Sequence, residues 1–298
     1  MTSLWGKIAA WYRADGRDLP WRRTEDPYRI VVSECMLQQT QVDRVVPLFL
    51  NFTRLFPSWE ALSAAPQSDV VRAWKGLGYN MRALRLKAMA EAVVARHGGS
   101  LPSDLESLLA LKGVGPYTAR AIRAFAFREQ TLAPDTNLRR VLNRVFKGPL
   151  ADPKRFDTRA WARWEESVPK NRAYDVNQGL MDIGATICKA QRPACEACPL
   201  RASCKAYPRI LKIRKLPSQK TARKERVDAL GIPNRIYRGR VIDFLRARSL
   251  PTAALDRLGR SVRERYDDDA HRDWLIGVLA GLEKDGLVIK KRGRWVLA

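Results

Sequence analysis

The chain has 298 residues, enough for two or three domains, and 46% of them are hydrophobic, which provides packed cores and argues against a disordered protein. Its 55 Lys and Arg against 31 Asp and Glu give a net charge of +24, which indicates a polyanionic partner, with nucleic acid as the first candidate. No run approaches the roughly 20 apolar residues of a membrane span, and the first residues lack the apolar segment of a secretory signal, so we expect a cytoplasmic protein without membrane contact. The alternatives are a membrane surface, for which we find no terminal amphipathic basic helix, and a shell of solvated arginines with no such partner.

Apolar residues at helical spacing predict a first half that is almost entirely α-helical, with each helix bounded by Pro, Gly or a Ser/Asp cap. The expected helices cover the stripe from Leu4 to Tyr12, the stretch from Tyr28 to Pro47, and residues 59–64, 70–74, 82–97 and 104–111. Helical spacing resumes between 153 and 187. Alternating strand patterns are scarce, so the fold class is mainly α.

The C-terminal third changes character twice. Residues 209–240 contain eleven Lys and Arg against two acids and show no periodicity, which predicts a basic linker that lies on phosphates. The last sixty residues show three helical stripes, and then apolar runs at 287–289 and 295–297 flank the turn sequence Arg292-Gly293-Arg294. This pattern predicts a small winged-helix-like domain, with a packing or partner-binding domain as the alternative.

Four of the five cysteines fall within seventeen residues, at a C-x6-C-x2-C-x5-C spacing. They are Cys188, Cys195, Cys198 and Cys204. Four thiolates in one short loop can close around a metal ion or a cubane cluster, and the spacing alone leaves zinc and iron–sulfur both open. Because no ligand position would remain open, we interpret the site as structural. The fifth cysteine, Cys35, is expected to be a small core residue.

The segment Leu111-Lys112-Gly113-Val114-Gly115-Pro116 predicts a helix-hairpin-helix. Gly113 and Gly115 allow a tight hairpin whose backbone N–H groups can approach a phosphate closely, and Pro116 begins the next helix. Such a motif anchors DNA without reading its sequence. An ordinary helix–helix corner is the alternative.

Two carboxylates stand in contexts that allow more than one interpretation. Glu34 lies within the apolar stretch 31–37, where it is either a helix-surface residue or a buried acid with a raised pKa that can donate a proton. Asp135 directly precedes a helix expected to begin near Leu138, so it is an N-cap, a catalytic carboxylate, or a neighbour of a capping Thr136.

Taken together, these residues resemble the MutY adenine DNA glycosylases of the helix-hairpin-helix superfamily. The matching stretches are 19–22 (LPWR), 33–42 (SECMLQQTQV), 76–79 (GLGY), 113–119 (GVGPYTA), 135–137 (DTN) and the cysteine loop. They follow the family order over roughly residues 1–208. The resemblance implies a two-lobed glycosylase fold with an iron–sulfur cluster loop. The expected domains are 1–25 plus 133–208 with the cluster, 26–132 with the helix-hairpin-helix, a basic linker 209–235, and the winged-helix-like domain 236–298.

The resemblance also assigns roles at the reacting nucleotide. It implies that Glu34 protonates adenine N7 and that Asp135 stabilises the oxocarbenium-like sugar. Tyr117 and Asn137 would line the same site and hold Asp135 and the water. Bifunctional relatives carry a lysine where this chain has Tyr117, and a phenol cannot form a Schiff base, so we expect a monofunctional glycosylase with little or no strand cleavage.

Further residues are expected to bind the DNA. Gln39 and Tyr79 would fill the gap left by the extruded base, and Trp21, Arg22 and Gln178 would lie in or beside the adenine pocket. The four cysteines would bind a 4Fe–4S cluster, with zinc as the minor alternative. The implied partner is double-stranded DNA with a mismatch or an oxidised guanine, bound by a monomer, in the nucleoid if the source is bacterial.

The chain departs from the family pattern in three places. In place of the C-terminal Nudix-like domain that reads 8-oxoguanine, this sequence ends in the winged-helix pattern. Thr136 stands where the family often has glycine, and Asn80 where it often has a second tyrosine.

The expected function is therefore excision of adenine opposite guanine or 8-oxoguanine. One alternative is a glycosylase for thymine or uracil opposite guanine, which would share Tyr117, Asp135 and the cluster. Glu34 argues against it, because a pyrimidine has no N7 to protonate. Another alternative is a non-catalytic iron–sulfur DNA-binding protein that reads DNA with its winged helix.

Overall fold

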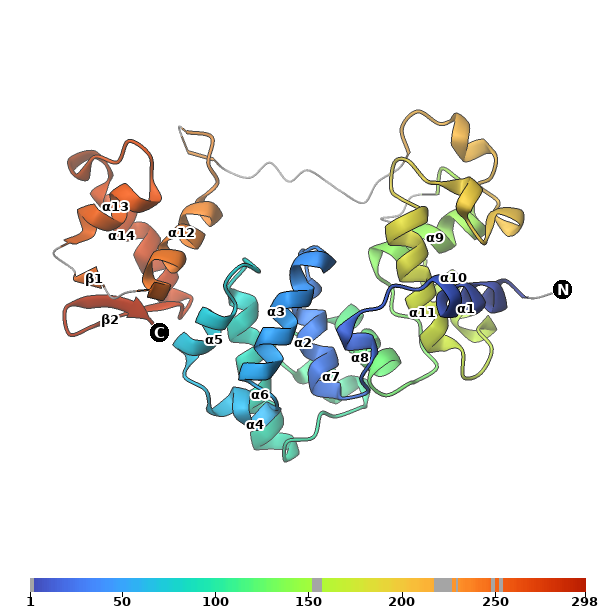
Figure 1. The fold of residues 1–298 in the computed structure, drawn as a ribbon, viewed down its shortest axis with the longest axis horizontal. Coiled ribbons are helices and arrows are strands. Elements are labelled where there is room, and N and C mark those ends of the chain that lie inside the picture. Colours follow the sequence, from blue (N-terminus) through green and yellow to red (C-terminus); the bar gives the residue numbers. More distant parts are fainter. Residues whose placement is uncertain (1–2, 152–156, 217–226, 229, 248–249, 252–253) are drawn as a thin grey trace. The chain divides into compact units, whose positions relative to one another are not determined.

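The computed structural model describes residues 3–151, 157–216, 227–228, 230–247, 250–251 and 254–298, and within them the fold is mainly helical, as predicted (Figure 1). The chain forms two compact units. Unit 1 contains residues 1–30, 102–110 and 114–222, and unit 2 contains residues 31–101, 111–113 and 223–298. None of the described helices combines the length and hydrophobicity needed to cross a bilayer.

Unit 1 is built from the helices of three chain segments. Its elements are α1 (Leu4–Asp15), η1 (Pro20–Arg22), α7 (Leu105–Ala110), α8 (Pro116–Phe125), α9 (Thr136–Phe146), α10 (Thr158–Ser167), α11 (Ala173–Asp182), the π turn η2 (Ile183–Ile187), and the short turns η3 (Cys195–Ala197), η4 (Arg201–Ser203) and η5 (Arg209–Lys212). Helices α1, α9 and α11 bury one another's apolar faces through Ile8, Val141 and Leu180, each at most 1% exposed. Gly179 allows the close approach of α1, because a Cβ there would lie 2.8 Å from the Ile8 side chain.

Helix α2 (Pro27–Leu37) begins in unit 1 and continues into unit 2. The other helices of this part of unit 2 are α3 (Val42–Leu55), α4 (Trp59–Ala64), α5 (Gln67–Ala73) and α6 (Met81–His97). Their core contains Phe52 and Trp74, both fully buried, with ring centroids 5.7 Å apart in an edge-to-face pair.

The prediction of one helix from Tyr28 to Pro47 was wrong. Helix α2 ends at Leu37, Gln39 adopts a left-handed φ of 59°, and α3 starts at Val42 and runs through Pro47. The left-handed residue breaks the helix, whereas Pro47 removes only one helix hydrogen bond and is tolerated.

The last part of unit 2 is a winged helix, as the pattern predicted. Its order is α12 (Asn234–Ala247), β1 (Leu250–Pro251), α13 (Leu255–Val262), α14 (Asp268–Lys284), β2 (Val288–Lys291) and β3 (Arg294–Leu297). The sheet is antiparallel in the order β1-β3-β2, and Trp295 pairs with both Leu250 and Lys290. Strand β1 was not predicted, because two residues are too few to show alternation.

The winged helix shares its core with α5. Val71 of α5 is fully buried in the same cluster as Leu245, Leu258 and Leu279. Arg246 of α12 donates to the carbonyl oxygen of Val71 at 3.2 Å and to Oδ1 of Asn80 at 2.8 Å. Apolar and polar contacts therefore both hold α12 against this part of unit 2.

One guanidinium on α6 organises the two loops that follow α2 and α5. Arg82 is 6% exposed, and its Nη atoms donate to the carbonyl oxygens of Cys35, Met36, Gln38, Leu77 and Gly78 and to Oγ1 of Thr40. These bonds satisfy the orphan carbonyls at the end of α2 and hold the turns that carry Gln39 and Tyr79. Sequence reasoning missed Arg82, since nothing local marks an arginine as buried.

We expect Arg82→Lys to lower the free energy of unfolding by roughly 3 kcal/mol, because a single ammonium cannot reach both sets of carbonyls and leaves several buried acceptors unpaired. Urea denaturation monitored by circular dichroism measures the change. Arg96→Lys, at an exposed site on the same helix, is the matched control and should change little. Equal stability of the two variants would contradict the role given to Arg82.

Candidate active site

Asp135 is the N-cap of α9. Its Oδ1 accepts a 2.6 Å hydrogen bond from the backbone N–H of Leu138, and its Oδ2 accepts one of 2.9 Å from Nδ2 of Asn137. The residue keeps some exposed surface, but protein atoms crowd its carboxyl, and this desolvation raises the pKa of Asp135 against the opposing effect of the two hydrogen bonds and Arg140. Helix α9 starts at Thr136, so Asp135 and not Thr136 is the cap. Capping and a charged role in chemistry are compatible, because the cap bond to Leu138 also holds the carboxylate in place.

A second guanidinium connects this carboxylate to the cysteine loop. Arg140 donates from Nη2 to Oδ1 of Asn137 at 2.8 Å and to the carbonyl oxygen of Gly184 at 2.5 Å, and from Nε to the carbonyl oxygen of Cys188 at 2.8 Å. Gly184 must be glycine here, because a Cβ would lie 2.5 Å from that of Asn137. Sequence reasoning missed Arg140 and Gly184, although the i, i+3 spacing from Asn137 to Arg140 indicated a shared helix face.

Tyr117 lies in the same unit as Asp135 and Asn137. It is the second residue of α8, is partly buried, and packs against a small cluster that includes Ile30 and Ala133. Tyr117, Asp135 and Asn137 therefore all belong to unit 1.

Of the residues expected around an adenine pocket, Arg22 binds a buried aspartate. Arg22 makes a two-pronged ion pair with Asp182, at 2.7 Å from Nη1 to Oδ2 and 2.8 Å from Nη2 to Oδ1, and Arg17 binds the same carboxylate. Burial raises the pKa of Asp182, but the hydrogen bonds and charges of Arg22 and Arg17 outweigh it and lower the pKa overall. Trp21 (8% exposed) precedes Arg22 in η1, and Gln178 (5% exposed) lies one turn before Asp182 on α11. Asp182 was missed because its two partners lie about 160 residues away.

Glu34 lies in unit 2, near the end of α2. It is 8% exposed and stands between the buried Ser33 and Cys35, so it is not a surface glutamate. Burial, with the charge of Glu34 beside it, raises the pKa of the Cys35 thiol to about 12. Cys35 is a buried core residue, as expected.

Gln39 and Tyr79 also lie in unit 2, on the two turns that Arg82 holds. Both adopt left-handed φ angles, 59° and 45°, which are strained for residues with a side chain. Tyr79 is 52% exposed, which leaves its ring available to a partner. A surrounding structure that fixes a strained, exposed turn is typical of a binding site.

The helix-hairpin-helix forms between α7 and α8. Gly113 adopts a φ of 96°, which a residue with a side chain rarely reaches, and a Cβ there would lie 3.2 Å from that of Arg85. Gly115 caps α8 in an extended conformation with open space around it. Only Gly113 is therefore demanded by the turn, while Gly115 leaves room for an approaching group.

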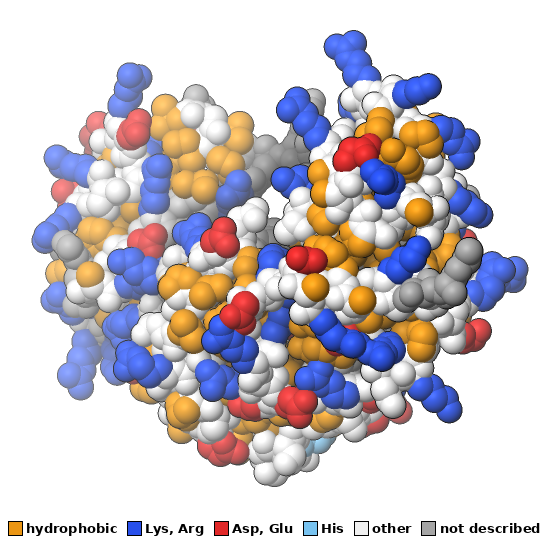
Figure 2. All heavy atoms as spheres, turned by 45° about the vertical axis from the view of Figure 1, so that its right-hand side comes forward, with side chains coloured by type: hydrophobic (Ala, Val, Ile, Leu, Met, Phe, Trp, Pro, Cys, Tyr) orange, Lys and Arg blue, Asp and Glu red, His pale blue; other side chains and the backbone are white. Residues whose placement is uncertain are grey.

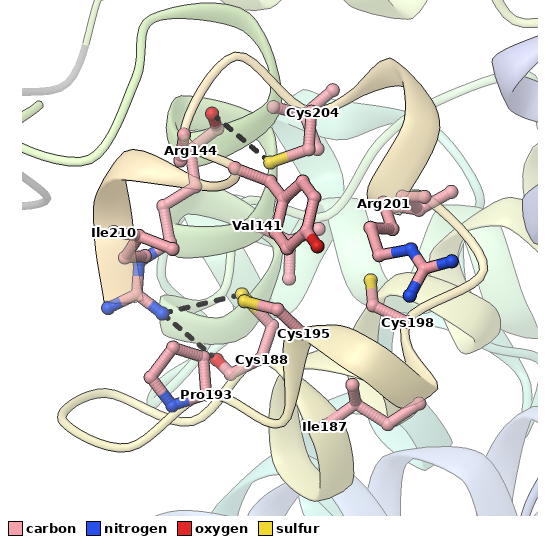
Figure 3. Close-up of a pocket in the computed structure, with 14 residues that line it drawn as sticks. Val141, Arg144, Ile187, Cys188, Pro193, Cys195, Cys198, Arg201, Cys204 and Ile210 are labelled. Atoms are coloured by element: carbon pink, nitrogen blue, oxygen red, sulfur yellow. Dashed lines mark hydrogen bonds between the residues drawn. The ribbon is translucent and has the colours of Figure 1, made fainter. Parts of the chain in front are cut away.

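The four loop cysteines surround one cavity in unit 1 (Figure 3). Arg144 of α9 donates to Sγ of Cys188 at 3.4 Å, and Sγ of Cys204 donates to the carbonyl oxygen of Arg144 at 3.6 Å. Burial raises the pKa of Cys195 and raises that of Cys198 to about 11, and the neighbouring thiolates add to both shifts. Without a positive centre, the thiolate forms are therefore disfavoured.

The donor set fits a metal centre, because four thiols line one cavity and thiolates are ligands of both zinc and iron–sulfur clusters. The cavity wall is otherwise apolar, with Val141, Ile187 and Ile210 among its residues, which suits a cluster shielded from water.

The family model that matches this chain is the HhH-GPD superfamily base excision DNA repair protein, over residues 32–166. The solved structure of a thermostable thymine-DNA glycosylase has a TM-score of 0.63 and 33% identity, covering 69% of this chain and 95% of that one. An endonuclease III–DNA complex gives a TM-score of 0.60 at 20% identity, which supports the fold. The class is therefore that of the helix-hairpin-helix DNA glycosylases.

Within this class, the chain belongs to the adenine DNA glycosylase family. The adenine DNA glycosylase of Mycobacterium tuberculosis is 38% identical over 82% of this chain and 79% of that protein. That of Mycolicibacterium smegmatis is 36% identical over 98% of this chain and 95% of that protein, so the alignment includes the winged helix.

We expect Asp135→Asn to fold with at least wild-type stability at pH 7. Asparagine is an equally good N-cap. Because the pKa of Asp135 is higher in the folded protein than in the unfolded chain, ionising Asp135 lowers the free energy of unfolding as the pH rises between these two pKa values. Urea denaturation at pH 7 is the measurement.

Asp157→Asn is the matched control at the N-cap of α10. The pKa of Asp157 is lowered to about 2, mainly by the hydrogen bond from Lys147. The charged aspartate therefore stabilises the fold at pH values above its pKa in the unfolded chain, and the asparagine variant should be less stable at pH 7. A larger loss of unfolding free energy for Asp135→Asn than for Asp157→Asn would contradict the raised pKa of Asp135.

Proposed function

We propose that the protein removes adenine mispaired with guanine or 8-oxoguanine from double-stranded DNA, as a monomer and as a step of base excision repair. The observation that carries the proposal is the similarity to an adenine DNA glycosylase over 98% of the chain. Lys and Arg side chains are spread widely over the face drawn in Figure 2, as a polyanionic partner requires. Such an enzyme works where the chromosome lies, which in a bacterium is the nucleoid.

In the proposed mechanism, the duplex is opened at the mismatch and the adenine is extruded. Gln39 and Tyr79 fill the vacated space, which suits their position on two strained turns that Arg82 holds. Trp21, Arg22 and Gln178 form or support the adenine pocket, with Arg22 fixed by Asp182. Gly113 and Gly115 anchor the backbone phosphates nearby.

Bond cleavage needs an acid for the base and a negative charge for the sugar. Glu34, which is buried near the end of α2, delivers a proton to adenine N7, so the base leaves as a neutral molecule. Asp135 stabilises the oxocarbenium-like sugar, either through its charge or through a covalent intermediate. Asn137 orients that carboxylate, and Tyr117 lines the site without forming a Schiff base.

The second candidate is excision of thymine or uracil. The thymine/uracil-DNA glycosylase of Methanothermobacter thermautotrophicus is 34% identical over 67% of this chain and 91% of that protein. We place it second because Glu34 has no purine N7 to protonate on a pyrimidine.

A panel of duplexes tests the choice. Purified protein is incubated with A·8-oxoguanine, A·G, A·C, T·G and U·G duplexes, and the free base is identified before and after alkali. We expect adenine from the first two, with strand breaks only after alkali. Thymine or uracil release would favour the second candidate, and binding without any base release would favour a non-catalytic protein.

We expect Glu34→Gln to reduce single-turnover adenine release at least a hundredfold while duplex affinity stays within about twofold, because the amide keeps the shape and loses the proton. Quench-flow and fluorescence anisotropy measure the two quantities. Retained turnover would remove Glu34 from the acid role.

We further propose that Cys188, Cys195, Cys198 and Cys204 hold a 4Fe–4S cluster. The cluster would lock the loop between η2 and η5, and with it a basic set suited to phosphates, Lys189, Arg192, Arg201 and Lys205. The guanidinium of Arg144 donates to Sγ of Cys188 and would compensate part of the negative charge of the ligands.

Iron and acid-labile sulfide analysis tests this site. We expect about four irons per chain and a brown chromophore in the wild type, and loss of both in Cys198→Ser. Cys35→Ala, in the core of α2, should keep the iron. A colourless protein with one zinc would support the alternative.

A further inference from the structure

The winged helix carries an unusual charge on the helix that would normally read DNA. In helix-turn-helix modules, the N-terminal residues of the recognition helix enter the major groove. The corresponding helix here is α14, which has Asp267 as its N-cap, begins with Asp268 and Asp269, and has Asp273 one turn later. Arg272 pairs with Asp268 and leaves the other three aspartates in excess. Phosphates repel this end, so α14 is unsuited to that role.

The first helix of the domain has the opposite character. Arg235, Arg238 and Arg240 of α12 line a groove of about 600 Å³, with Gln39 and Tyr79 on its other side. We call this the α12 groove. In total, five arginines and two aspartates line it, so its walls are positively charged.

Both walls of the α12 groove belong to unit 2 and are fixed to each other. Arg246 of α12 bonds to Asn80, the residue after Tyr79, and Nε2 of Gln67 donates to the carbonyl oxygen of Gly286 at 2.6 Å. The buried cluster around Val71 adds an apolar contact. The groove is therefore a built feature beside the exposed Tyr79 ring.

The arginines of α12 are held in place by their neighbours. Arg238 pairs with Asp285, and Nη1 of Arg240 donates to the carbonyl oxygen of Val262 at 2.7 Å. Asp285 offsets the charge of Arg238, whereas the carbonyl oxygen that Arg240 binds is uncharged, so the two arginines together keep a net positive charge. Positioned guanidinium groups with spare N–H donors are the usual partners of phosphate oxygens.

We propose that the α12 groove, and not α14, is the DNA-binding surface of the winged helix, and that it binds the phosphodiester backbone beside the extruded nucleotide. This rests on the proposed function, which places Gln39 and Tyr79 at the vacated base. The groove adjoins both residues, so a duplex that receives them brings its backbone to α12.

Gly239 provides a test that removes no existing contact. It lines the groove on α12, and an added Cβ would meet no atom within 4 Å. Gly277 on α14 is the matched control, since it is also helical, also open, and exposed. Gly239→Glu and Gly277→Glu change the net charge equally.

We expect Gly239→Glu to weaken binding of an A·G duplex about tenfold and to reduce the slope of log Kd against log salt by about one, measured by fluorescence anisotropy on the full chain. Gly277→Glu should stay within twofold of wild type, and Gly239→Lys should bind as tightly as wild type or tighter. Equal effects of the two Glu variants, or equal weakening by Gly239→Lys and Gly239→Glu, would overturn the proposal.

The readout is affinity, so it is independent of base release. Failure of the wild type to release adenine in the duplex panel would overturn the proposed function, whereas unchanged affinity of Gly239→Glu in an active enzyme would overturn the α12 groove alone.

Discussion

The carboxylate of Asp135 must be held in a fixed place while it is largely removed from water. Desolvation disfavours its charged form, and a freely rotating side chain would not keep its oxygens in one place. The start of α9 meets both demands, because the Leu138 amide and Asn137 fix the oxygens and the helix dipole favours their charge. The capping role therefore depends on the bond from the Leu138 amide, and the proposed catalytic role depends on both bonds.

Other parts of the backbone are fixed by hydrogen bonds from buried or partly buried arginines. Arg82, Arg140 and Arg144 each bond to several backbone carbonyl oxygens, and each ties a loop to a helix. Arg140 and Arg144 join α9 to the cysteine loop, so the helix that Asp135 caps also holds this loop. Part of the +24 net charge thus serves the fold rather than DNA.

Much of this arrangement was predictable because its signals are local. The helix periods, the cysteine spacing and the hairpin turn of the winged helix depend on neighbours in sequence. The break at Gln39 was missed, since no glycine marks it, and Arg82, Arg140 and Asp182 were missed because their partners come from distant segments. The roles of Glu34 and Asp135 came from the family resemblance, and the sequence left each with a structural alternative.

The state of Asp135 in the protein is measured most directly by its own titration. Carbon-13 NMR of the Asp135 carboxyl in the DNA-free protein gives its pKa, and the Leu138 amide should report the same transition through the cap. The account predicts a midpoint above the ordinary value of 3.8. A midpoint at or below that value, or a Leu138 amide that does not respond, would contradict it.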